Sequence, residues 1–140
     1  MPVGIEAKSN EKVSQRRSKT MRLNFVKGHM GGNTIVLLHG SQIEKGRELE
    51  ITLCILSGEY LSCHEAGILY QPENKGDLKV KIVGHASKRF ISACGGMTQV
   101  LGHALVETDI GKPYGISVAN SRTNIILGTE CKRAGIGVLL

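Results

Sequence analysis

The sequence predicts an α+β domain in which a sheet packs around one amphipathic helix, and three observations lead to this prediction. Apolar residues recur at the spacing of a single helical face in Met97, Val100, Leu101, Ala104 and Leu105. A glycine-rich turn at residues 28–33 separates two short apolar segments, as in a hairpin. Residues 78–83 alternate between apolar and polar side chains over most of their length, which is typical of a half-exposed strand.

The elements before residue 60 follow from local patterns. The two hairpin strands are expected at residues 22–27 and 34–39. Residues 47–56 fit both a strand and a helix, because their apolar residues alternate while Leu49, Leu53 and Leu56 also share one helical face. We favour the helix for this segment.

The later elements are bounded by glycine and proline. A short buried strand is expected at residues 67–71, ending at Pro72, and a turn at residues 73–77. The central helix should end at the segment Gly111-Lys112-Pro113. Two further strands are expected at residues 116–119 and 124–128.

The composition is that of an ordinary globular domain, with 41% hydrophobic and 21% charged residues among 140. No apolar run approaches the ~20 residues that a membrane helix requires, and the N-terminus does not have the pattern of a signal sequence. We therefore expect no membrane partner and a cytoplasmic location.

Half of the net charge of +6 lies in the first 20 residues of the chain. Residues 1–20 contain five basic and two acidic residues, a net charge of +3, and show little apolar periodicity. We expect a disordered basic tail at residues 1–20 and a single domain at residues 21–140. With no Trp, two Phe and three Tyr, the chain offers no aromatic platform for stacking bases, so no nucleic-acid partner is expected.

The four cysteines are Cys54, Cys63, Cys94 and Cys131, and none belongs to a CxxC pair or a Cys/His ladder. This spacing predicts neither a structural metal site nor a disulfide framework. Cys54 lies in an apolar run and is expected to be a small buried hydrophobic residue. The roles of Cys63 and Cys131 stay open.

Cys94 differs from the others because a strand-like segment ends there in the turn Cys94-Gly95-Gly96 and the central helix begins. A helix N-terminus carries free N–H groups and a partial positive charge. A thiol at this position is expected to ionise near neutral pH, and an anion could dock beside it, since Gly95 and Gly96 let a ligand approach the backbone closely. A buried structural thiol is the alternative.

Two segments resemble the diaminopimelate epimerases. Residues 25–33 are similar to the opening signature F-x-K-x-H-G-x-G-N of that family, matching it at Phe25, Lys27, His29, Gly32 and Asn33. Residues 67–72 and 77–82 look like the family's paired strands, and Cys94-Gly95 falls where its C-G-N-G-x-R motif begins. The 61 residues between Asn33 and Cys94 are close to the family's own spacing.

The resemblance covers residues 21–128 and corresponds to the N-terminal half of such enzymes. It implies half of a two-domain α+β fold, a strongly curved, mostly antiparallel sheet wrapped around a central helix, with one catalytic cysteine per domain. It also implies racemisation or isomerisation of a small carboxylate or amino acid without cofactor or metal. One thiolate removes the proton α to the carboxylate and the opposite thiol returns one. The other half would come from a homodimer partner, a second subunit, or the remainder of a longer chain.

By the same resemblance, Cys94 would be the acid or base, and Asn33, Gly95, Gly96 and His85 would contact the substrate. Gly96 stands where the family has Asn, and Gln99 stands where it has Arg, so the substrate should not be diaminopimelate. Two other functions stay open. One is a non-catalytic domain that binds a small carboxylate, and the other is a lyase or dehydratase that uses the same thiol.

Overall fold

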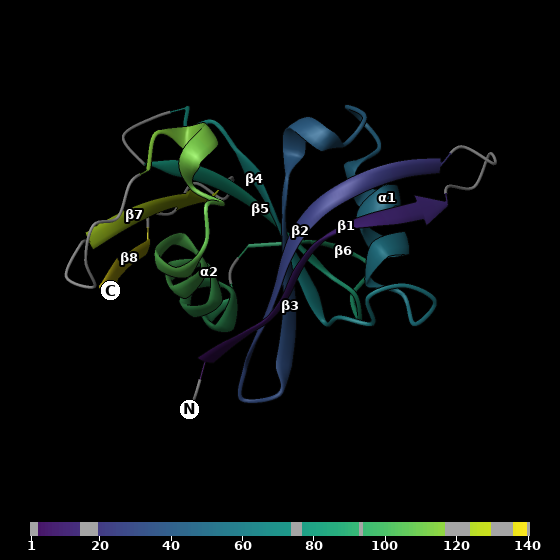
Figure 1. Ribbon diagram of the computed structural model, residues 1–140, viewed down its shortest axis with the longest axis horizontal. Helices are drawn as coiled ribbons and strands as arrows, with labels where there is room; N and C mark the ends of the chain where they lie inside the picture. The colour runs from purple at the N-terminus through teal and green to yellow at the C-terminus, as the bar shows by residue number, and fades with distance from the viewer. Residues whose placement is uncertain are drawn as a thin grey trace.

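The computed structural model describes residues 3–14, 20–73, 77–92, 94–116, 124–129 and 136–139 (Figure 1). Its strands are β1 (Val3–Ser14), β2 (Thr20–Met30), β3 (Asn33–His39), β4 (Glu65–Tyr70), β5 (Leu78–Gly84), β6 (Arg89–Ile91), β7 (Asn124–Thr129) and β8 (Ile136–Leu139). Its α-helices are α1 (Glu48–Leu56) and α2 (Gly95–Glu107), and its short 3-10 helices are η1 (Gly40–Gln42) and η2 (Lys112–Tyr114).

The described strands form one mixed sheet in the order β1-β2-β3-β4-β5-β7-β8, with β6 paired to β5. The pairs β3–β4 and β5–β7 are parallel, and the other described pairs are antiparallel. The predicted α+β class is therefore confirmed. The predicted hairpin is β2–β3, and the predicted helix at residues 47–56 is α1.

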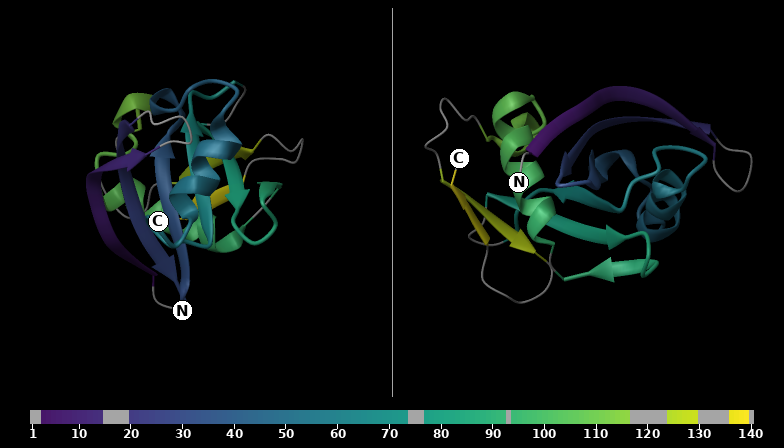
Figure 2. Two further views of the ribbon diagram at one scale, coloured as in Figure 1. Left: turned by 90° about the vertical axis from the view of Figure 1, so that its right-hand side faces the viewer. Right: turned by 90° about the horizontal axis from the view of Figure 1, so that it is seen from below.

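The two helices cover opposite faces of the sheet, because strand side chains alternate between faces. Ile35 and Leu37 of β3 belong to the core around α2, whereas Val36 and Leu38 pack with α1. Helix α2 contacts both β1 and β8, the two ends of the sheet order, so the sheet curls around this helix. Figures 1 and 2 show α2 beside β7 and β8, with α1 on the far side of the sheet.

The central helix buries the predicted stripe. Met97, Val100, Leu101, Ala104 and Leu105 are all at most 5% exposed. Gly102 on the same helix is also buried. The second core, formed by α1 on the opposite face, was not anticipated as a separate layer.

The N-terminal segment contradicts its sequence-based description. Residues 3–14 were expected in a disordered tail, but β1 pairs antiparallel with β2 from Val3 opposite Met30 to Ser14 opposite Thr20. The physical reason is that the exposed edge of β2 offers backbone hydrogen bonds, which a polar segment can make as well as an apolar one. The domain therefore begins before residue 21.

The predicted strand at residues 124–128 is β7, whereas Ile116 follows η2 outside any strand and residues 117–119 lie outside the described residues. Part of the predicted turn at residues 73–77 and Cys131 also lie outside them. Cys54 is only partly buried, and Cys63 is buried at 4% exposure. None of the helices in the described ranges has the length and apolar character needed to cross a membrane.

Candidate functional site

Cys94 is the N-cap residue of α2, as the turn Cys94-Gly95-Gly96 predicted. Its backbone is extended, with φ −152° and ψ 111°, and its Sγ accepts a hydrogen bond from the Met97 N–H at 3.4 Å. The Thr98 backbone N–H and side-chain hydroxyl both donate to the Cys94 carbonyl. The thiol thus replaces the Ser or Asp side chain that usually caps a helix, and its direction is fixed by the helix itself.

Asn33 lies beside this thiol although 61 residues separate the two in sequence. Its Nδ2 donates toward the Cys94 Sγ at a distance of 4.0 Å. Gly31 and Gly32 form the preceding turn with φ of +56° and +87°, values that glycine adopts without strain. The turn therefore places Asn33 at the first position of β3, on the same face as Ile35, toward α2.

The two glycines after Cys94 have different surroundings. A Cβ atom at Gly96 would lie 3.2 Å from the Asn33 Nδ2, which is a tight contact. A Cβ atom at Gly95 would meet nothing within 4 Å among the described residues, and Gly95 is exposed. Gly96 therefore leaves room for the Asn33 amide, while Gly95 faces an open approach to the thiol.

Glu65 completes the cluster, and sequence reasoning missed it. It begins β4, which runs parallel to β3 with Ile35 opposite Glu65. Gly67 and Leu69 of β4 pack toward α2, so strand alternation places Glu65 on that face as well. Its Oε2 is buried and has no hydrogen-bond partner among the described residues. The sequence could have pointed to Glu65 through strand alternation, because residues 65, 67 and 69 of a strand lie on the same face.

The environment of the thiol raises the pKa of Cys94 above its usual value. Burial is the largest cause, and the charge and hydrogen bonding of the Glu65 carboxylate add to it. The backbone N–H groups of Met97 and Gly96 lower the pKa but do not offset the other effects. The sequence-based expectation of a thiolate near neutral pH is therefore wrong, because burial of the sulfur and the nearby Glu65 carboxylate outweigh the effect of the helix N-terminus on the pKa.

The structure positions His85 by its backbone. Its backbone N–H donates to the His64 carbonyl at 2.9 Å, at the point where β5 has ended. His64 in turn accepts the Thr34 N–H on its Nδ1 at 3.1 Å, and its own N–H donates to the Thr34 carbonyl at 2.9 Å. These bonds hold the starts of β3 and β4 together, which fixes Asn33 relative to Glu65.

The described residues contain no group of three or more His, Cys, Asp and Glu side chains arranged to hold a metal ion. What the site offers is one thiol, one carboxylate and one amide at a helix N-terminus. This combination can transfer a proton and hydrogen-bond an anionic ligand.

No protein-family model matches the chain, and a search of curated proteins found no significant match.

Proposed function

We propose that the chain is an epimerase-like isomerase domain that transfers the proton α to the carboxylate of a small acid, with Cys94 as its acid or base and no cofactor. The observation that supports this proposal best is the 4.0 Å contact between Asn33 Nδ2 and Cys94 Sγ. These two residues belong to the two separate segments that resemble the epimerases. A cysteine retained only for packing gives no reason for an amide donor to meet its sulfur.

In this proposal the resting form of Cys94 is the thiol, because burial and Glu65 raise its pKa. The thiol donates its proton to the α-carbon of the substrate carbanion, and the sulfur becomes a thiolate. The Met97 N–H then stabilises the negative charge, together with the other free N–H groups at the start of α2. In the reverse direction, the thiolate removes the α-proton. A raised pKa makes this thiolate scarcer but more basic, which suits a weakly acidic C–H bond.

Glu65 and Asn33 have positioning roles in the same scheme. The Glu65 carboxylate disfavours the thiolate and so keeps the proton on sulfur until the carbanion forms. The Asn33 amide hydrogen-bonds either the sulfur or the substrate carboxylate, since it carries two N–H donors. The open side at Gly95 is where the substrate carboxylate reaches the helix N-terminus.

Inversion requires a second acid or base on the opposite face of the substrate. We propose that a second copy of the chain, another subunit or a further domain supplies it. Exchange of the α-proton on one face needs only Cys94. Exchange and inversion are therefore separate measurements, and the first one tests this chain alone.

The test is deuterium wash-in at the α-carbon of a panel of small carboxylates and amino acids in D₂O, followed by ¹H NMR. We expect at least one compound to lose its α-proton signal with the natural chain and with Cys54→Ala, which removes a thiol on α1 outside the site. Cys94→Ala should abolish the exchange. Exchange that persists in Cys94→Ala would refute the proposed role, and deuterium uptake without elimination would argue against a lyase.

A non-catalytic carboxylate-binding domain is the second candidate, and the raised pKa of Cys94 favours it. A domain that only binds needs no ionisable thiol, and a buried sulfur is an adequate helix cap. This candidate predicts binding of a carboxylate, observed as chemical-shift changes at Gly95 and Gly96, with no deuterium uptake. It also predicts that Cys94→Ser binds as well as the natural chain.

A further inference from the structure

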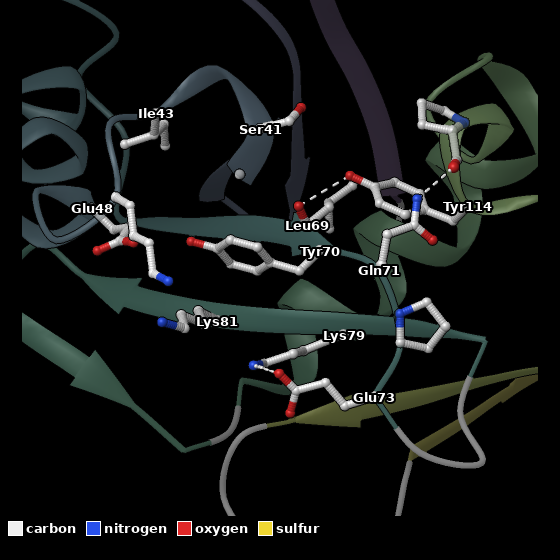
Figure 3. A pocket seen from close by; sticks show the side chains of 14 residues that line it. Ser41, Ile43, Glu48, Leu69, Tyr70, Gln71, Glu73, Lys79, Lys81 and Tyr114 are labelled. Carbon is white, nitrogen blue, oxygen red and sulfur yellow. Dashed lines mark hydrogen bonds and ion pairs between the residues drawn. The ribbon is translucent and has the colours of Figure 1, made fainter.

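A cavity of about 680 Å³ lies at the end of β4 opposite Glu65, on the α1 side of the sheet (Figure 3). Tyr70, Lys79 and Lys81 form one wall, and residues of η1 and of the segment that leads from it to Glu48, the first residue of α1, form another. Pro113 and Tyr114 of η2 close one end. Tyr70 lies five positions after Glu65 along β4, about 17 Å in a strand, so this cavity is distinct from the site at Cys94.

The cavity is held in shape by specific contacts. A Cβ atom at Gly40 would collide with the ring of Tyr70, so glycine at this position lets the ring lie against η1. The Tyr114 hydroxyl donates to the Leu69 carbonyl at 3.0 Å, and the Gln71 amide donates to the Pro113 carbonyl at 2.7 Å. Figure 3 shows both bonds joining the η2 wall to β4. A volume of this size with fixed walls is in the range of small-molecule sites.

Positive charge is concentrated on one wall. The ammonium groups of Lys79 and Lys81 lie 5.8 and 5.3 Å from the centre of the Tyr70 ring, so both cations lie near this ring. Lys79 pairs with Glu73 at 2.7 Å, and Figure 3 shows Glu48 at the far end of the Tyr70 ring. Three lysines, counting Lys45, and two glutamates line the cavity, which leaves an excess of one positive charge.

Apolar surface faces this charge. Ile43, Leu69, Pro72 and Pro113 also line the cavity. Prolines present flat, rigid surfaces against which a planar group can pack, and a pocket that is mainly apolar with a few convergent charges is typical of organic ligands. An inorganic ion would use the lysines and leave the apolar surface in contact with water.

We propose that this cavity is a second binding site, for an organic monoanion with a carboxylate or sulfonate group on a flat apolar body. The anion lies against the wall that carries Lys79 and Lys81, whose ammonium groups are its charged partners. The apolar body fills the space between Ile43 and the prolines. One negative charge balances the lining, which is why a monoanion fits better than a doubly charged phosphate ester.

The test compares two fluorescent probes that differ in one charged group. The probe 1-anilinonaphthalene-8-sulfonate carries a sulfonate on an aromatic body, and N-phenyl-1-naphthylamine is its uncharged counterpart. We expect saturable binding of the sulfonate, weakened about tenfold in Lys81→Met and in Lys79→Met, because a charge-assisted contact is lost. Binding of the uncharged probe should change less than about twofold. Lys88→Met, a matched change at an exposed lysine that does not line the cavity, should alter neither.

Sulfonate binding that is absent, or that is equal in all three lysine variants, overturns the proposal. Equal weakening of both probes overturns it as well, because the variants would then have changed the shape of the cavity rather than its charge. Should a lysine variant fail to fold, ¹H–¹⁵N NMR of the natural chain gives an independent answer. Shifts confined to residues 40–48, 69–73, 79–81 and 113–114 on adding the sulfonate support the site, and shifts elsewhere refute it.

Discussion

Replacing Gly96 with alanine tests whether the Asn33 amide and the start of α2 are fitted to each other. The first turn of α2 contains Gly95 and Gly96 side by side. Alanine in place of glycine at either position should stabilise the fold by about 0.5 kcal/mol, because the unfolded chain loses conformational freedom and the helix gains propensity. The two positions differ in what the new methyl group meets.

At Gly95 the methyl group meets nothing within 4 Å, so the full gain should appear. At Gly96 it lies 3.2 Å from the Asn33 Nδ2, with the Ile35 Cδ1 at 3.6 Å. The amide must therefore move by a few tenths of an ångström. Because the amide is already 4.0 Å from the Cys94 Sγ, this movement breaks the contact and costs about 1 kcal/mol. Gly96→Ala should then be about 1 kcal/mol less stable than Gly95→Ala.

The assay is thermal and urea unfolding of the two variants beside the natural chain. A difference of about 1 kcal/mol corresponds to about 3–4 °C in Tm for a domain of this size. The side-chain NH₂ signals of Asn33 should shift in Gly96→Ala and stay in place in Gly95→Ala. Equal stability of the two variants, with unchanged Asn33 signals, would refute the reasoning that Gly96 makes room for this amide.

Three further predictions concern the site, the core and pH. Glu65→Gln should lower the Cys94 pKa, since the carboxylate raises it, and so speed Cys94 alkylation at pH 7; slower alkylation would contradict this. Leu101→Ala should cost about 2–5 kcal/mol in urea unfolding, because Leu101 is 0% exposed beneath the sheet; a loss under 1 kcal/mol would contradict it. Burial lowers the His39 pKa below 6.5, so its contribution to stability is complete above pH 6.5 and is lost as pH falls through the folded-state pKa. His39→Gln should therefore lose less stability between pH 7 and pH 5 than the natural chain, and equal losses would contradict the assignment.

Much of the fold could be predicted because its elements carry strong local patterns. The stripe on α2 and the glycine turn before Asn33 are complete within a dozen residues each, and both were placed correctly. Strand β1 was missed because the net charge of residues 1–20 outweighed the short alternation of Val3, Ile5 and Ala7, although Ile5 packs against the α2 core and the backbone pairs with β2. The parallel pairing of β3 with β4 depends on contacts distant in sequence, which periodicity does not record.

Some residues of the candidate site could likewise be predicted from the sequence, and others could not. The glycine turn before Asn33 and the helix start at Cys94 could be predicted from local patterns, and the fold brings the two residues together. Glu65 carries no motif, and only the register of β4 against β3 places it beside the thiol. The direction of the Cys94 pKa followed from Glu65 and from burial, so it could not be predicted from the helix N-terminus alone. The contact of His85 with substrate stays a prediction, and its backbone N–H donates to the His64 carbonyl.

The most direct test of the account is the rate of iodoacetamide labelling at each cysteine of the folded protein as a function of pH, read by mass spectrometry. We predict that Cys94 labels without unfolding, because it is partly exposed, and that its rate rises with pH later than that of a free thiol. Cys63, which is 4% exposed, should label only on unfolding and serves as the internal control. A Cys94 that reacts only when the protein unfolds would contradict the account, since a thiol closed to iodoacetamide in the folded protein is also closed to a small substrate.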